Sequence, residues 1–222
     1  TMAKSGKDSK DAGKRKIDVR QAVKSDARTW YELLIMSSPS LEEVFDEKTL
    51  KRLFEAEGNL FSHELTLFIE VNGTPAAMLL GFCWRTKRKL DLPTGYQALA
   101  GLKFKIVDKL PVMLRCLGNI GVVNRYEYFI SNLAALPEFR GIGLGEMLLH
   151  EAEKLAAGCG AKYISIEVEQ DNGTAIKLYQ KNGFQVEKEA SVNIGGRKYF
   201  YRMLKCIEER KTPRTNGKEA LN

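Results

Sequence analysis

Residues 140–145 read Arg-Gly-Ile-Gly-Leu-Gly, and this short stretch decides how the rest of the chain is interpreted. An apolar run from Tyr128 to Leu136 precedes it, and an amphipathic run from Glu146 to Ala157 follows it. This order predicts a strand, a glycine turn and a helix. The unpaired N–H groups and the positive dipole end of that helix meet at one point. The sequence therefore predicts an anion site there, most simply a site for a phosphate group.

Two familiar phosphate-binding loops do not fit this stretch. A dinucleotide-binding loop of the form G-x-G-x-x-G needs a glycine where this chain has Glu146. A P-loop needs a lysine followed by serine or threonine directly after its last glycine, and neither is present. A purely structural turn stays open as an alternative, although three alternating glycines exceed what one tight turn needs.

The patterns on both sides of the turn predict a chain of alternating strands and helices. Downstream, Lys162–Val168 reads as a strand, which completes a β-α-β unit, and Asp171 or Asn172 caps a short helix that ends at Asn182. The remaining expected elements are strands at 17–23, 64–71, 76–84, 184–192 and 197–204 and helices at about 26–36 and 41–57. Residues 87–125 suggest helices interrupted at Pro111, in a segment that looks like an insertion.

Two motifs resemble those of a known superfamily. The stretch from Asn132 to Gly145 resembles the acetyl-CoA signature of the GNAT superfamily of N-acetyltransferases. The stretch from Asn172 to Tyr179, followed by Asn182-Gly183-Phe184, resembles its second signature in the family's order and spacing. The resemblance covers about 127–187, roughly a quarter of the chain. It implies the GNAT fold, which is an α+β fold with three α-β-α layers. Its mixed, mostly antiparallel twisted sheet has a central parallel strand pair that splays apart to admit CoA.

The charge distribution separates a domain from two tails. The net charge is +7, of which residues 1–16 contribute +4 and residues 205–222 contribute +2. We therefore expect a disordered basic tail at 1–16, a single GNAT acetyltransferase domain at 17–204 with a helical insertion at 87–125, and a disordered C-terminal tail at 205–222. Because the positive charge lies mainly in the tails, nucleic-acid binding is not expected.

The resemblance also implies acetyl-CoA as the cosubstrate and a place for each part of it. The pyrophosphate is expected on the backbone amides of the glycine turn, and the pantetheine arm on the strand before it, held by an asparagine. The implied cofactor-binding residues are Leu133, Ala134, Ala135, Arg140, Gly141, Ile142, Gly143, Leu144, Gly145, Glu146 and Asn172. Glu146 departs from this pattern because an acidic side chain beside a phosphate is unfavourable. A plain helix cap is the alternative role of Asn172.

The implied reaction is N-acetyl transfer from acetyl-CoA to a primary amine by direct attack in a ternary complex. The amine must lose a proton, and Glu167 is the favoured base because it lies on the strand face opposite Ile166 and Val168. Glu169 and His63 compete for this role, and a solvent-facing strand residue is the plain alternative for Glu167. Tyr179 is the expected acid that protonates the departing thiolate, and a core aromatic is its alternative role.

The remaining expectations concern partners and location. The acceptor is expected to be a small-molecule or peptide amine, and a non-catalytic acyl-CoA-binding regulatory module is the alternative function. No apolar run approaches the roughly 20 residues that span a bilayer, so no membrane contact and a cytoplasmic location are expected. Apolar residues of the segment 99–117 could cover the acceptor cleft or form a homodimer surface. No metal is expected, since the four cysteines Cys83, Cys116, Cys159 and Cys206 are widely spaced.

Overall fold

The computed structural model of the chain describes residues 15–102, 121–193 and 197–207. Its strands form one seven-stranded sheet in the order β1-β2-β3-β4-β5-β7-β6. Only β4 and β5 are paired in parallel, and every other neighbouring pair is antiparallel. The strands are β1 (Ile17–Gln21), β2 (Thr66–Val71), β3 (Thr74–Cys83), β4 (Glu127–Ala135), β5 (Tyr163–Glu169), β6 (Gln185–Asn193) and β7 (Arg197–Cys206).

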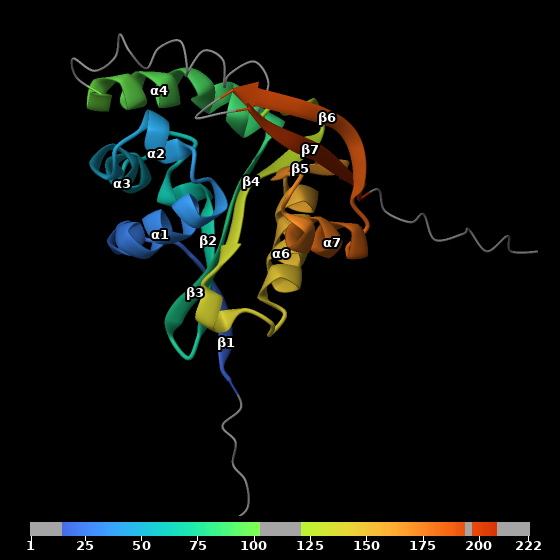
Figure 1. Cartoon of the computed structure of the whole chain (residues 1–222). Helices are drawn as coiled ribbons and strands as arrows, with labels where there is room; N and C mark the ends of the chain where they lie inside the picture. Colours follow the sequence, from blue (N-terminus) through green and yellow to red (C-terminus); the bar gives the residue numbers. More distant parts are fainter. Residues whose placement is uncertain (1–14, 103–120, 194–196, 208–222) are drawn as a thin grey trace, which may run out of the picture.

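Helices cover both faces of the sheet, so the expected three-layer α+β architecture is confirmed. Figure 1 shows α1 and α3 on one side of the sheet and α6 and α7 on the other. Each side has its own buried apolar cluster, one around Trp30 and Phe54 and the other around Leu148 and Ile164. The α-helices are α1 (Ala27–Ser37), α2 (Leu41–Val44), α3 (Glu47–Glu55), α4 (Trp84–Leu102), α6 (Leu144–Gly158) and α7 (Gly173–Lys181). Short 3₁₀ turns occupy Lys24–Asp26, His63–Leu65 and Pro137–Phe139.

The central parallel pair separates part of the way along its length, as the resemblance implied. The two strands are paired from Glu127 and Tyr163 as far as Ile130 and Ile166. Beyond that point β4 follows β3, and β5 follows β7. The register between β3 and β4 shifts at Leu80/Gly81, so that Ser131 is an extra residue in β4. Such a bulge bends its strand, which places the bend of β4 where β5 departs.

The element boundaries differ from the expected ones in the region after β3. Trp84 begins α4 instead of ending the preceding strand, and α4 continues through Pro93 to Leu102. The expected break at Pro111 lies outside the described residues. Strand β7 continues to Cys206, two residues beyond the expected end of the domain at residue 204. None of the described helices is long and apolar enough to cross a bilayer.

Candidate active site

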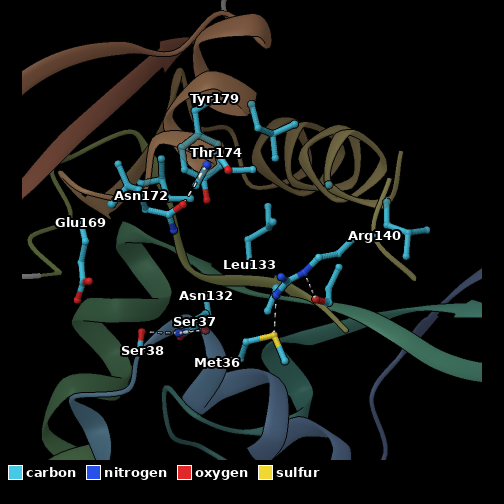
Figure 2. A pocket seen from close by; sticks show the side chains of 18 of the residues that line it. Met36, Ser37, Ser38, Asn132, Leu133, Arg140, Glu169, Asn172, Thr174 and Tyr179 are labelled. Atoms are coloured by element: carbon cyan, nitrogen blue, oxygen red, sulfur yellow. Dashed lines mark hydrogen bonds between the residues drawn. The ribbon is translucent and has the colours of Figure 1, made fainter. Parts of the chain in front are cut away.

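A cavity of about 630 Å³ opens where β4 and β5 separate. Its walls come from β4, β5, the connection between α1 and α2, the glycine turn and the start of α7. Figure 2 shows Asn172, Thr174 and Tyr179 across the cavity from Ser37 and Ser38. The favoured catalytic residues and the expected cofactor-binding residues all line the cavity except Ile142, whose side chain packs against the core on the α6 side. The cavity therefore brings the two sequence motifs together.

The structure explains the three glycines of the turn in different ways. Gly141 and Gly143 adopt left-handed conformations, with φ of +79° and +87°. Glycine takes such a conformation without the steric cost that a side chain imposes. Gly145 packs closely against α7, because a Cβ atom there would lie 2.8 Å from Cδ2 of Leu178 and the Leu178 side chain would have to shift. The turn is thus tightly constrained even before a ligand is considered.

The N-terminus of α6 is open toward the cavity. Its N-cap residue is Gly143, which has no side chain to accept hydrogen bonds from the first-turn amides. A Cβ atom added at Gly141 or Gly143 would meet nothing within 4 Å, so the space over the turn is empty. The N–H groups and the dipole at such a helix start favour an anion, so the residues present could hold a pyrophosphate.

We expect Gly143→Ala to destabilise the protein by about 1–2 kcal/mol, because an alanine is strained in the left-handed conformation. The turn is expected to relax and misdirect the first-turn amides of α6, so CoA binding should also weaken. Thermal unfolding and calorimetric CoA titration measure the two effects. Gly158→Ala is the matched control, since Gly158 is exposed at the far end of the same helix with nothing within 4 Å of its added Cβ. Equal CoA affinity in both variants would contradict the assignment of this turn.

Two charged residues lie beside the glycine turn. Glu146 pairs with Lys181 of α7 at 2.6 Å, and both side chains are exposed. The Lys181 ammonium group therefore partly offsets the negative charge of Glu146 beside the turn. Arg140 donates from Nε to the carbonyl oxygen of Ala135 at 3.2 Å and lies at the opposite end of the view in Figure 2 from Glu169. The cationic end and the carboxylate end of the cavity are therefore separate.

The free edge of β4 offers backbone groups to the cavity. The N–H of Leu136 donates to Ala76 on the β3 side at 2.9 Å. Because neighbouring residues of a strand point their backbone groups to opposite edges, those of Leu133 and Ala135 point away from β3 and toward the gap. An amide-bearing chain can add to such an edge as a strand would.

Asn172 has the capping role that was its alternative and still lines the cavity. Its Oδ1 accepts a hydrogen bond from the N–H of Ala175 at 3.1 Å, which caps the start of α7. The cap uses only the side-chain oxygen, so the amide NH₂ keeps two N–H donors. Capping and contact with a ligand are therefore compatible in this residue.

Tyr179 is a buried aromatic whose hydroxyl group reaches the cavity. Its ring packs against Phe184 with ring centroids 5.9 Å apart, and only 5% of the residue is exposed. Burial raises the pKa of the Tyr179 hydroxyl. The phenol therefore carries its proton at neutral pH and can act as a proton donor to a group in the cavity.

The carboxylate of Glu167, the favoured base, is hydrogen-bonded to the backbone. Its Oε2 accepts a hydrogen bond from the N–H of Gly121 at 2.9 Å. Burial raises the pKa of Glu167, an effect opposed by the Gly121 hydrogen bond and by the nearby Arg202 and Lys188. Glu169 also lines the cavity, whereas His63 does not line it and contacts the carbonyl oxygen of Phe54 at 3.0 Å. The arrangement favours Glu167 or Glu169 over His63 as a base.

Sequence motifs did not reveal one wall of the cavity. Met36, Ser37, Ser38 and Pro39, at the end of α1, line the side opposite α7. Asn132 holds this wall in place, because its Nδ2 donates to the hydroxyl oxygens of Ser37 and Ser38, each at 2.9 Å. Asn132 is only 4% exposed, and its place at the start of the first sequence motif was the available signal. Among the described residues, no group of three or more His, Cys, Asp or Glu side chains could hold a metal ion.

The chain is similar to known proteins both in sequence and in structure. The model of the acetyltransferase (GNAT) family matches residues 28–184. The N-alpha-acetyltransferase RimI of Mycobacterium tuberculosis is 32% identical over 87 residues, which are 39% of this chain and 49% of that protein. The chain thus spans about half or less of the curated relatives it matches.

Two solved structures share the fold. An N-acetyltransferase from Staphylococcus aureus has a TM-score of 0.65 and 17% identity, with 84% of this chain and 99% of that chain covered. The Salmonella typhimurium protein yncA, solved with its cofactor acetyl-CoA, has a TM-score of 0.55 and 20% identity, with 90% and 98% covered. At 17% and 20% sequence identity, these similarities show that the chain shares the fold of the two proteins.

Proposed function

Since this chain belongs to the acetyltransferase (GNAT) family, we propose that it transfers an acetyl group from acetyl-CoA to a primary amine of a small molecule or peptide. The observation that carries the proposal is the cavity between the separated strands β4 and β5, which joins an open helix N-terminus to a buried tyrosine and a glutamate. The acetyl-CoA in the yncA structure supports the choice of cosubstrate.

We propose a place in the cavity for each part of acetyl-CoA, which supplies the acetyl group as a thioester. The backbone amides from Gly141 to Glu146 are proposed to hold the pyrophosphate, with Arg140 beside them. The edge of β4 at Leu133 and Ala135 is proposed to pair with the amides of the pantetheine arm. The NH₂ group of Asn172 is proposed to donate to the same arm.

Two side chains are proposed to move protons. Glu167 accepts a proton from the acceptor ammonium at Oε1, the oxygen that has no hydrogen-bond donor among the described residues. Tyr179 donates its hydroxyl proton to the departing sulfur. A backbone N–H of the β4 edge donates to the oxygen on which negative charge develops during attack. Such a set of fixed donors and acceptors stabilises charge in a site from which water is partly excluded.

The acceptor is proposed to enter from the end of the cavity opposite the pyrophosphate. Glu167 and Glu169 lie on one face of β5 and line that part of the cavity. Carboxylates attract a cationic ammonium group, whereas Arg140 marks the other end. The names of RimI and of a Bacillus subtilis relative, which refer to alpha-amine and ribosomal-protein alanine acetylation, support a peptide N-terminus as one acceptor class.

Mass spectrometry of mixed amine pools incubated with the protein and acetyl-CoA tests this function. The pools should include peptides with free N-termini, polyamines, amino acids and aminoglycosides. The expected result is an acetylated amine together with release of free CoA in equal amount. Tight CoA binding without transfer to any amine would instead favour the non-catalytic acyl-CoA-binding module.

The activity should be lost on the acidic side of the pH profile, and at a higher pH than is usual for a glutamate base. The pKa of Glu167 is raised above its ordinary value of 4.5, so the carboxylate takes up a proton as the pH falls through that raised value. Because only the ionised form accepts a proton from the ammonium, kcat/KM should fall on the acidic side with an apparent pKa above 4.5. The pH dependence of kcat/KM measures this limb, and a limb at or below the ordinary glutamate value contradicts Glu167 as the base.

A further inference from the structure

Arg202 of β7 is a deeply buried charge that the proposed chemistry does not use. Its side chain is 1% exposed. Its three nitrogens donate to three groups: Nε to Glu187 Oε2 at 2.7 Å, Nη1 to the carbonyl oxygen of Val122 at 2.8 Å, and Nη2 to Glu127 Oε2 at 2.5 Å. A buried ion pair is costly to desolvate and gives little net stability over apolar packing. Stability alone therefore does not explain this buried ion pair, and we ask what the fixed geometry of Arg202 does for the protein.

The partners of Arg202 converge on the backbone segment 121–124. The carbonyl oxygen of Val122 accepts from Arg202. Asn124 donates to Glu127 from its backbone N–H at 3.0 Å and from Nδ2 at 2.8 Å. Glu127 in turn accepts from Ser165 Oγ of β5 at 3.1 Å, so the carboxylate is held from several sides. The segment is thus attached to three neighbouring strands, β4, β5 and β7.

The same segment touches the proposed base. The N–H of Gly121 donates to Glu167 Oε2 at 2.9 Å, next to the Val122 carbonyl that Arg202 holds. Glu167 and Arg202 are also register partners between β5 and β7. The arginine therefore acts on the glutamate by two routes, through the backbone of 121–122 and through its own charge.

We propose that Arg202 is a positioning residue of the active site. Together with Glu127 it clamps residues 121–124 to the sheet, so that Gly121 occupies one oxygen of Glu167 and leaves the other for the acceptor amine. The inference rests on the proposed function, in which Glu167 is the base. The clamp itself is a property of the protein alone and can be measured without turnover.

The charges around Glu167 determine the direction of the expected effect. Arg202 on β7 and Lys188 on β6 both lower its pKa, as does the Gly121 hydrogen bond. Glu169 is the acidic neighbour on its own strand, and Glu127 on β4 is paired with Arg202. Releasing the clamp removes the Gly121 bond, so the pKa of Glu167 rises and the acidic limb of kcat/KM moves to higher pH.

One variant breaks the clamp at Arg202, a second weakens it at Asn124 while Arg202 stays in place, and a third is the matched control. Arg202→Lys keeps the positive charge but cannot donate to Val122 and Glu127 with a planar fork. Asn124→Ala removes the Nδ2 bond to Glu127 and keeps every buried charge, which protects the test if Arg202→Lys fails to fold. Glu187→Gln changes only the partly exposed partner of Arg202 and leaves the segment 121–124 attached.

Hydrogen exchange of the Gly121 and Asn124 amides measures the clamp, because these N–H groups donate to Glu167 and Glu127. We expect at least about tenfold faster exchange in Arg202→Lys and Asn124→Ala than in the parent and in Glu187→Gln. The acidic limb of kcat/KM should move up by about one pH unit in the same two variants, with CoA affinity unchanged.

Folded variants with the parent's exchange rates overturn the clamp. Faster exchange with an unmoved acidic limb overturns its role in positioning Glu167. A parent without any transfer activity refutes the proposed function, while the exchange data still decide the clamp.

Discussion

Replacing Tyr179 by phenylalanine is expected to lower kcat by about 10²–10⁴-fold while CoA still binds with the parent's affinity. The ring of Tyr179 packs against Phe184 in the core, and phenylalanine keeps that packing. Only the hydroxyl group is lost, and no hydrogen bond to it is described in the protein, so the fold should tolerate the change. The lost function is protonation of the departing sulfur. Steady-state kinetics and calorimetric titration with CoA measure the two quantities.

Tyr163→Phe is the control for this substitution. Tyr163 begins β5, at the paired end of the parallel strands and away from the cavity, and it is also partly buried. Its variant should keep the parent's kcat. A Tyr179→Phe variant with unchanged kcat would show that the thiolate leaves without this proton donor, and Tyr179 would then be a core aromatic.

Replacing Glu167 by glutamine is expected to reduce kcat/KM by about 10²-fold or more and to remove the acidic limb of its pH profile. The glutamine side-chain oxygen can still accept the N–H of Gly121, so the local geometry is retained. The neutral amide cannot accept a proton from the acceptor ammonium. At high pH, where the free amine is abundant, part of the activity should return.

The variant Glu169→Gln distinguishes between Glu167 and Glu169, the two carboxylates that compete for the role of base. Both residues line the cavity from the same face of β5, so loss of either charge alters the local field similarly. We expect Glu169→Gln to raise the KM for the amine and to keep the acidic limb. If Glu169→Gln removes the limb and Glu167→Gln keeps it, Glu169 is the base.

The elements that the sequence predicted well have a clear apolar pattern and are bounded by turn residues. Strand β2 consists mainly of apolar residues and ends at the Asn72-Gly73 turn, and α6 begins at a glycine turn, so their type and approximate bounds follow from local physics. The boundary after β3 was less clear because Phe82, Cys83 and Trp84 are all apolar. A continuous apolar run does not mark the residue at which a buried strand gives way to a helix.

The parts of the site that depend on tertiary packing could not be predicted. The wall formed by Ser37 and Ser38 reaches the cavity only because Asn132 binds both hydroxyl groups from β4. The close packing at Gly145 arises from Leu178, a residue on another helix. Arg202 was overlooked in the strand 197–204, where a single arginine between Tyr201 and Met203 was the only signal of a buried charge.

The central claim is that the separated strands β4 and β5 hold the cosubstrate, with its pyrophosphate at the N-terminus of α6. A crystal structure of the protein in complex with CoA tests this most directly. We predict pyrophosphate oxygens within hydrogen-bond distance of the backbone amides from Gly141 to Glu146, and the pantetheine arm along Leu133 and Ala135. A nucleotide bound elsewhere, with those amides in contact with solvent or with the protein's own side chains, would contradict the account.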